Sequence, residues 1–484
     1  MSISTTPDDS PSTERSPRPA PEPPSGELRR SMGTRHLVMI AMGGVIGSGL
    51  FLSSGYTIAQ AGPLGAVLSY LVGAFVVYLV MTCLGELAVA YPVSGAFHIY
   101  ASRSINPATG FTTAWLYWLT WAVALGSEFT ACGLLMQRWF PGVSVWIWCV
   151  IFAAVVFTVN AISARVFGET EYWFSLIKVI AVLALIVLGG AAVAGFHPLA
   201  DSHHAFPTLF QNFHTANGLF PHGMSGILVT VLAAFYAFSG SELIGVAAGE
   251  TDDPTRAVPK ALRVTVFRLL VFFVGSITVI AAMIPYHKVG LDESPFVTVF
   301  SAIGIPYAAD IMNFVIITAL LSAGNSGLYS CARMLFSLAD EGHAPKALRR
   351  LNKRQIPMTA LVVSMLGGLA SLLSSVVAAQ TVYLVLVSIA GFAAVAVWMS
   401  IAASQFFHRR AFLRDGGEIG SLAYRTPLYP VVPVAAFALC LVALVGVAMD
   451  PTQVAALYFG IPFVAACYLY FFLRLRFRTQ AATR

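Results

Sequence analysis

Two glycine- and serine-rich stretches, each within a long apolar segment, contain the residues best suited to bind a small polar ligand. The first, GGVIGSG, covers residues 43–49, and four of its seven residues are glycine. The second, FSGSE, covers residues 238–242 and adds a carboxylate, Glu242. Because glycine destabilises a helix by about 1 kcal/mol relative to alanine, each stretch predicts an interruption in a helix.

A break in a helix leaves backbone groups free to bind charged ligands. The amides of Ser48, Gly49 and Leu50 would favour an anion, and freed carbonyl groups could accept hydrogen bonds from an ammonium group. A free amino acid carries both charges close together, so the paired breaks predict an amino acid binding site. The alternative is close helix packing through small residues. The expected substrate contacts are Ile46, Gly47, Ser48, Gly49, Ser239 and Gly240.

Four ionisable residues lie inside apolar segments, where a charge near the membrane centre costs at least about 2.5–3.5 kcal/mol. Glu128 is expected to face the positive side chain of a substrate, or to pair structurally with a base or with hydrogen-bond donors. Lys178 is a candidate for proton exchange, since burial disfavours its charged form; alternatively its side chain extends to the membrane surface. Glu242 could couple protonation to gating or accept hydrogen bonds from the loosened backbone. Glu86 is expected to be structural.

Membrane-spanning helices must hold these residues in place. Of the 484 residues 57% are hydrophobic and 10% are charged, whereas a soluble protein would have about 25% charged residues. About 20 apolar residues cross a bilayer as a helix, so the predicted fold class is an all-α integral membrane protein with twelve transmembrane helices. The spans centre near Ile46, Val76, Ala124, Ala154, Leu185, Ala234, Val274, Ala323, Gly368, Ala394, Leu439 and Ala465.

The predicted domain organisation places one transmembrane domain between two tails. Residues 1–30 are proline-rich with little to bury and predict a disordered tail, residues 31–474 form the domain, and residues 475–484 form a C-terminal tail. The two breaks fall in spans one and six, which correspond if the first ten spans form two inverted halves with a site between them. The halves are expected over about 36–195 and 223–407, with extra helices over about 428–474.

The basic residues predict the orientation, because lysines and arginines near spans stay on the cytoplasmic side. They gather around Arg103, in 256–263, in 346–354, in 409–425 and in the C-terminal tail, whereas residues 196–222 contain none. Both termini are therefore expected in the cytoplasm. The net charge of +6 follows from this topology and gives no reason to expect nucleic acid as a partner.

Other chemistries find little support in the chain. The six cysteines lie in apolar segments without the spacing of metal ligands or a disulfide framework. A phosphate-binding loop, a metal-binding helix pair and a nucleophile elbow are all missing from the sequence, so we expect no enzyme, metal or cofactor. The expected partners are an amino acid, protons and the lipid bilayer. An external loop expected to be solvated holds His197, His203, His204, His214 and His222.

Longer motifs resemble a known family. GGVIGSGLFLSSGYTIAQAGPLGA, LGELAVAYPVSGAF, SELIGVAAGETDDPTRAVPKA and LSAGNSGLYSCARMLFSLADEG resemble the bacterial amino acid transporter family of the amino acid–polyamine–organocation superfamily. The resemblance covers nearly the whole chain after Arg30. It implies a five-plus-five inverted-repeat fold with broken helices 1 and 6 and two extra helices. It also implies alternating access and proton-coupled uptake across the bacterial cytoplasmic (inner) membrane.

The resemblance implies roles for individual residues as well. Lys178, in SLIKVIAV, matches a lysine that replaces the cation of sodium-coupled relatives in proton-coupled members. Tyr236 and Phe238 resemble the family's aromatic gate over the substrate, with plain packing as the alternative. Asn325, in LSAGNSG, is expected to line the cavity or the lysine site.

The substrate expected from the resemblance is a cationic amino acid. WLYWLTWAVALGSEFTACGLLMQRWFP and IPMTALVVSMLGGLASLLSSVV are most similar to S-methylmethionine permeases, and arginine/ornithine and lysine permeases resemble the chain nearly as well. All three groups carry cationic substrates, which suits Glu128. The expected function is proton-coupled import, of S-methylmethionine first and of arginine, ornithine or lysine second. A membrane sensor that binds amino acids without transporting them is the alternative of another class.

Overall fold

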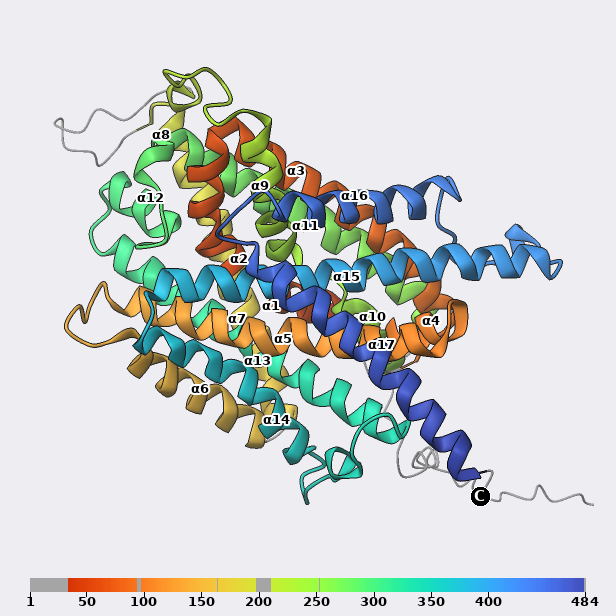
Figure 1. Cartoon of the computed structure of the whole chain (residues 1–484). Coiled ribbons are helices and arrows are strands. Elements are labelled where there is room, and N and C mark those ends of the chain that lie inside the picture. The colour runs from red at the N-terminus through yellow and green to blue at the C-terminus, as the bar shows by residue number, and fades with distance from the viewer. Residues whose placement is uncertain (1–33, 94–96, 163, 197–209, 252, 483–484) are drawn as a thin grey trace, which may run out of the picture.

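The computed structural model describes residues 34–93, 97–162, 164–196, 210–251 and 253–482 (Figure 1). Every regular element in these ranges is helical, apart from an isolated bridge between Thr215 and Gly218. This confirms the all-α prediction. The predicted N-terminal tail lies outside the described residues, as do His197, His203 and His204.

The helices follow one another with short connections. Up to residue 196 they are α1 (Thr34–Val45), α2 (Ser48–Phe51), α3 (Ser53–Ala90), α4 (Phe97–Ser104), α5 (Pro107–Met136), α6 (Val145–Ile162), α7 (Ala164–Ala184) and α8 (Gly190–Val193). Beyond it they are α9 (Gly223–Phe238), α10 (Leu243–Ala247), α11 (Pro254–Met283), α12 (Pro295–Ile303), α13 (Ala308–Asp340), α14 (Met358–Gly368), α15 (Ala379–Arg414), α16 (Val431–Val447) and α17 (Ala455–Ala482).

Ten helical segments in the described ranges are long and apolar enough to cross a membrane. The predicted twelve spans are reached by adding the first broken helix and the shorter apolar helix α16, so that number stays a prediction. Within α3 the backbone turns at Gly62, whose φ of 75° is left-handed, and Pro63 follows. The first part of α3 therefore continues the broken helix, and the rest forms the next span.

Local sequence signals explain several helix ends. The side chain of Asn106 accepts a hydrogen bond from the Thr109 amide, and Pro107 begins α5. Asp253 caps α11 in the same way, with Pro254 at its first position. Both are favourable N-terminal combinations. At the C-terminus the structure differs from the predicted tail, since α17 continues to Ala482. Its last residues include arginine, glutamine and alanine, which favour helix even where the apolar run has ended.

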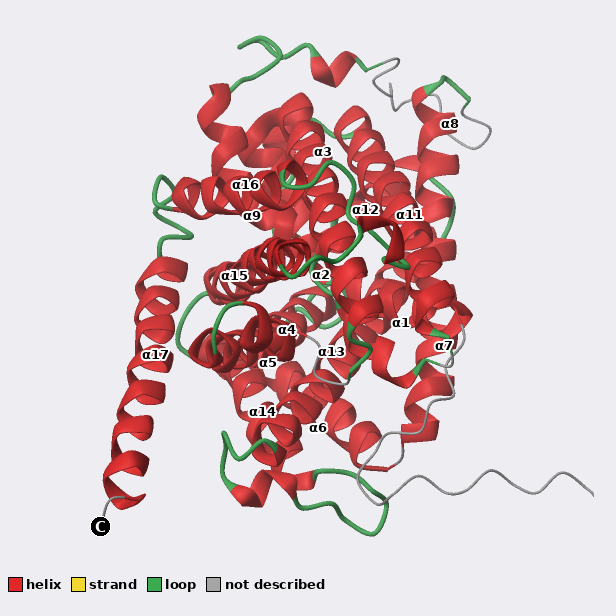
Figure 2. Cartoon of the chain, turned by 90° about the vertical axis from the view of Figure 1, so that its right-hand side faces the viewer, coloured by secondary structure: helices red, strands yellow, loops and turns green. Residues whose placement is uncertain are grey.

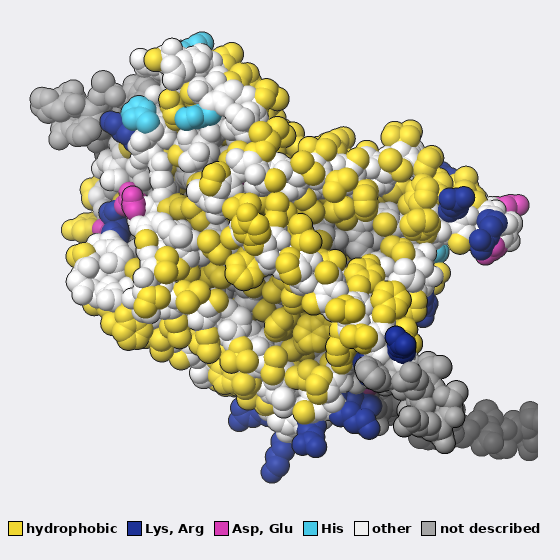
Figure 3. Space-filling view, viewed as in Figure 1, with side chains coloured by type: hydrophobic (Ala, Val, Ile, Leu, Met, Phe, Trp, Pro, Cys, Tyr) yellow, Lys and Arg dark blue, Asp and Glu magenta, His cyan; other side chains and the backbone are white. Residues whose placement is uncertain are grey.

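Helix α5 forms the centre of the bundle and packs against α6, α13, α14 and α15. By contrast, α17 runs along the outside of the bundle and exposes most of its residues (Figure 2). The two broken helices lie on the other side of the core, where α1 and α2 pack against α9, α10 and α11. The large apolar surface of the bundle (Figure 3) fits hydrocarbon surroundings.

Lysines and arginines gather at one end of the bundle, at the bottom and right of Figure 3. We call this the basic end, and it includes Arg103, Arg263, Arg349, Arg350, Lys353, Arg410, Arg414 and Arg425. At the opposite end Arg138 forms ion pairs with Glu293 and Asp310. Burial would lower the pKa of Arg138 and only partly offsets these two carboxylates, so the Asp310 hydrogen bond and the Glu293 charge raise it.

Candidate functional site

Both predicted helix breaks are present. Helix α1 ends at Val45, Gly47 is extended with φ −138° and ψ −153°, and α2 begins at Ser48. Helix α9 ends at Phe238, and Gly240 adopts a positive φ of 102°, which few side-chain-bearing residues tolerate. The prediction of two broken helices is therefore confirmed.

The two breaks lie against each other. A Cβ atom added to Gly49 would lie 2.6 Å from the Cα of Ala237, and one added to Gly240 would lie 2.9 Å from the carbonyl oxygen of Gly44. Helix α1 packs against α10, and α2 packs against α9. The half before one break thus pairs with the half after the other, as two antiparallel broken helices require. Glycine at these positions permits the close backbone approach.

Glu128, from α5, reaches directly into the first break. Its carboxylate accepts hydrogen bonds from the Ser48 amide (3.1 and 3.2 Å) and from the Ser48 hydroxyl (2.9 Å). Both side chains are buried. Among the described residues, no lysine, arginine or histidine lies within salt-bridge distance of Glu128. A buried carboxylate with hydrogen bonds but without a paired cation remains an attractive site for a positive group.

The amides predicted to bind an anion have partners in the chain. The Ser48 amide donates to Glu128, and the Leu50 amide donates to the carbonyl oxygen of Gly47 at 3.1 Å. In this conformation Glu128 therefore satisfies part of the position expected for a substrate carboxylate. That contact matches the structural alternative for Glu128, and it does not exclude the substrate-facing one.

Tyrosine hydroxyls hold the carbonyl groups that the break frees. Tyr383 donates to the carbonyl oxygen of Ser48 at 3.0 Å and lies 2.7 Å from the Ser53 hydroxyl. Tyr70 donates to the carbonyl oxygen of Gly49 at 3.1 Å. Sequence reasoning missed both tyrosines, because they come from α15 and α3 and only the tertiary fold brings them to the break.

The two aromatic gate candidates point in different directions. The Tyr236 hydroxyl lies 2.9 Å from the Ser127 hydroxyl on α5, one residue from Glu128. The Phe238 ring stacks on Phe273 with centroids 4.6 Å apart. Both side chains are buried. Tyr236 thus lies on the Glu128 side of the break, while Phe238 packs against α11.

Lys178 on α7 binds the end of α1. Its Nζ donates to the carbonyl oxygen of Gly43 at 2.5 Å, and its side chain is fully buried, so it does not extend to the surface. The charged groups that act on it are Glu171 and Glu128. The lysine therefore joins α7 to the helix that precedes the break.

Glu171 is a buried carboxylate that sequence reasoning missed. Its Oε1 accepts a 2.6 Å hydrogen bond from Ser322 of α13, and its Oε2 has no hydrogen-bond partner among the described residues. A Cβ added to Gly43 would lie 2.1 Å from Glu171 Oε1, so Glu171 and Lys178 both contact Gly43. The spacing of seven residues, which is two helical turns, is the signal that could have placed both on one face of α7.

The second break has its own carboxylate. Glu242 accepts hydrogen bonds from the Gly240 amide at 3.0 and 3.1 Å and from Trp398 Nε1 at 3.3 Å, and it is buried. This geometry matches the alternative in which Glu242 satisfies the loosened backbone. Ser239, next to Gly240, is extended and buried. Glu128 and Glu242 thus each bind an amide of one break.

Two other candidates lie away from the breaks. Asn325 of α13 is buried, and its Oδ1 accepts a 2.6 Å hydrogen bond from Asn160 of α6. Glu86 forms a buried ion pair with Arg409, whose Nε lies 2.7 Å from Oε1, and it also accepts a bond from the Thr426 amide. This supports the structural role expected of Glu86. In the described part of the chain no three metal-ligating side chains come together.

Comparison with known proteins identifies the family. The family model described as amino acid permease matches residues 36–482. The amino-acid permease RocE of Bacillus subtilis is 53% identical over 94% of this chain and 97% of its own length, and a putative histidine permease of the same organism is 50% identical over 92% and 93%. The lysine-specific permease LysP of Escherichia coli is 41% identical over 90% and 91%. The chain therefore belongs to the amino acid permease family, as its motifs predicted.

Proposed function

We propose that the chain is a proton-coupled importer of a cationic amino acid and that it works by alternating access. As a member of the permease family it is an amino acid transporter. The charge of the substrate, the coupling ion and the direction of transport are the proposed parts.

The observation that carries the proposal is the buried Glu128 carboxylate at the first break. It is held by Ser48, where the backbone can also bind the amino and carboxyl groups of an amino acid. A substrate with a positive side chain would bring to this carboxylate the cation that no described residue supplies at salt-bridge distance. A neutral substrate would leave the buried charge unpaired, which is unfavourable.

Lys178 and Glu171 support proton coupling. Both are buried against Gly43 at the end of α1, and a basic group in such a place can exchange a proton when its surroundings change. Since Lys178 holds the carbonyl of Gly43, loss of its proton would weaken the contact between α7 and the broken helix. Protonation would in this way be linked to movement of α1.

The names of the relatives support a basic side chain on the substrate. LysP is named for lysine and the putative permease of Bacillus subtilis for histidine. None of the three relatives reported above is named for S-methylmethionine, so the expectation that this compound ranks first is without support from them. S-methylmethionine, arginine, ornithine and lysine therefore enter the test together.

The orientation that suits import in a bacterial inner membrane has the basic end in the cytoplasm. Helix α17 ends at the basic end, where Arg474 donates a hydrogen bond to the carbonyl oxygen of Gly342 in the loop after α13. We propose that both termini are cytoplasmic.

The proposal is tested with the purified full-length protein in sealed vesicles. Uptake of labelled arginine is measured with competition by lysine, ornithine, S-methylmethionine, histidine and neutral methionine, under an inward proton gradient or an inward sodium gradient. We expect one or more cationic amino acids to accumulate and compete, with stimulation by protons but not by sodium. Equal competition by methionine would contradict the cationic substrate, a sodium requirement would contradict proton coupling, and binding without accumulation would indicate a sensor.

A further inference from the structure

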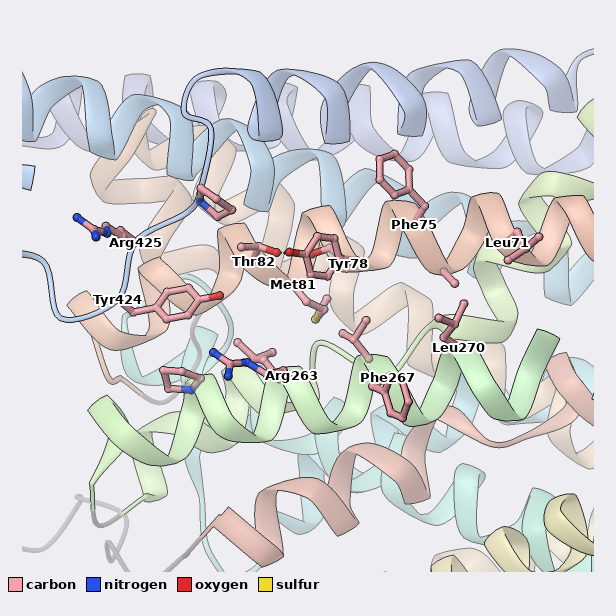
Figure 4. Close-up of a pocket in the computed structure, with 15 residues that line it drawn as sticks. Leu71, Phe75, Tyr78, Met81, Thr82, Arg263, Phe267, Leu270, Tyr424 and Arg425 are labelled. Atoms are coloured by element: carbon pink, nitrogen blue, oxygen red, sulfur yellow. The ribbon is translucent and has the colours of Figure 1, made fainter. Parts of the chain in front are cut away.

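A groove of about 670 Å³ lies on the outside of the bundle, remote from the two breaks. Its walls are α3, α11 and the segment that follows α15 (Figure 4). Most of its lining is apolar. The side chains on α3 run from Leu71 to Thr82, and those on α11 run from Pro259 to Leu270.

The apolar part of the groove faces the membrane. Phe75 is 54% exposed and Phe267 is 66% exposed, and they stand on opposite walls. From Leu71 to Thr82 the wall extends roughly 16 Å at 1.5 Å per residue. This is about half of the ~30 Å hydrocarbon thickness of a bilayer, so the groove has the length of one leaflet.

Two arginines mark the other end of the groove, which is part of the basic end. Arg263 on α11 and Arg425 on the segment after α15 lie at the same end, with Tyr424 between them in Figure 4. Both arginines are exposed. Neither has an acidic partner within salt-bridge distance among the described residues.

The segment that carries Arg425 is fixed in place by its neighbour. The Thr426 amide donates to Glu86 Oε2 at 2.7 Å, and its hydroxyl donates to the carbonyl oxygen of Thr82 at 3.2 Å. Thr426 is buried. The second arginine is therefore attached to α3 itself, so the basic end of the groove is part of the built structure.

We propose that this groove binds an anionic phospholipid from the leaflet at the basic end. One acyl chain lies between α3 and α11, and the phosphate lies at Arg263 and Arg425. An apolar channel of one leaflet's length with unpaired cations at its interfacial end has the chemistry of an anionic lipid, since basic pockets between membrane helices recognise such headgroups. A free phosphate would use only the arginines, and a zwitterionic lipid would gain little from them.

The test uses the full-length protein in a neutral detergent. It is titrated with phosphatidylglycerol, with phosphatidylcholine of the same acyl chains, or with inorganic phosphate, and the Tm and the lipid retained in native mass spectrometry are measured. A ligand that binds only the folded state raises the Tm. We expect phosphatidylglycerol to raise it by several degrees and to be retained, phosphatidylcholine to do so weakly, and phosphate to have no effect.

A pair of double variants locates the effect. Arg263→Gln with Arg425→Gln should abolish the preference for phosphatidylglycerol. Arg350→Gln with Lys353→Gln removes the same charge from exposed positions between α13 and α14 and should leave the preference unchanged. Equal retention of both lipids by the wild-type protein, an equal Tm rise with phosphate, or a preference that survives in the first double variant would overturn the proposal. The comparison of lipids on the wild-type protein needs no variant to fold.

Discussion

The carboxylate of Glu128 accepts hydrogen bonds from both the backbone amide and the side-chain hydroxyl of Ser48, at the residue where the first broken helix resumes. This contact joins α5, the centre of the bundle, to the break itself. Any cation that neutralises Glu128 therefore acts on the backbone of the break without an intermediate element. Four predictions concern the surroundings of this contact, and a fifth concerns the contact itself.

Gly49→Ala should weaken substrate binding by about tenfold or more, because its Cβ would lie 2.6 Å from the Cα of Ala237 and overpacking costs about 1–3 kcal/mol. Equilibrium binding of a labelled substrate to the purified variant measures the loss. Gly190→Ala is the matched control, since a Cβ there meets open space. Normal affinity in the Gly49 variant would remove the close contact of the breaks from the binding site.

Lys178→Ala should abolish the pH dependence of uptake, and Glu171→Gln should alter it, because both side chains contact Gly43 at the end of α1. Initial uptake rates over a range of external pH give the profiles. Lys353→Gln, at an exposed position of the basic end, should keep the profile of the unmodified protein. An unchanged profile in the Lys178 variant would show that the proton binds elsewhere.

Arg409→Met should destabilise the protein strongly, because it leaves Glu86 buried without its cation. Loss of one partner of a buried ion pair costs about 3–5 kcal/mol. Adding Glu86→Gln should recover part of the lost Tm, since the remaining charge is removed. Arg138→Gln breaks two partly exposed pairs, which contribute about 0–1 kcal/mol each. A Tm loss for Arg138→Gln as large as that for Arg409→Met would contradict this reading.

Glu341 should make stability depend on pH under acidic conditions. Burial by itself would raise its pKa, but hydrogen bonds and charges from His343 and His98 outweigh this and hold the pKa at about 2, against an ordinary 4.5. A lowered pKa in the folded state stabilises it above pH 4.5, and this stabilisation is lost as the pH falls towards 2. Glu341→Gln should lower the Tm at pH 6 and flatten its decline below pH 5.

The control for this pH effect is Glu418→Gln, whose exposed side chain lies in the loop after α15. It should reproduce the Tm curve of the unmodified protein. A Glu341 variant with the same acid sensitivity as the unmodified protein would show that other carboxylates cause the decline.

The helix breaks could be predicted from sequence because their signal is local: clustered glycines and a carboxylate within apolar runs. Glu128 and Lys178 stood out for a related reason, as isolated charges in long apolar segments. Glu171 did not, because it lies near the start of its helix in GETEYW, where a carboxylate also suits a solvated helix end. Only its contacts with Ser322 and Gly43 distinguish it.

Partners from distant helices could not be predicted. The contacts of Tyr383 and Tyr70 with the break depend on how α15 and α3 pack, and in sequence each is an aromatic residue among apolar ones. The end of α17 was misplaced because hydropathy marks the end of an apolar run, whereas helix propensity continues the helix to Ala482.

The most direct test of a cationic substrate is its affinity for the Glu128→Gln variant compared with that of neutral methionine. Glutamine keeps an oxygen that can accept the Ser48 hydrogen bonds, so the change isolates the charge. We predict a loss of about 1.5–3 kcal/mol, roughly 10- to 150-fold in Kd, for every cationic substrate that the unmodified protein binds, as for a charge-assisted contact. Methionine should bind no worse than before. Equal losses for methionine and for the cationic substrates would contradict the account and leave Glu128 as a structural partner of Ser48.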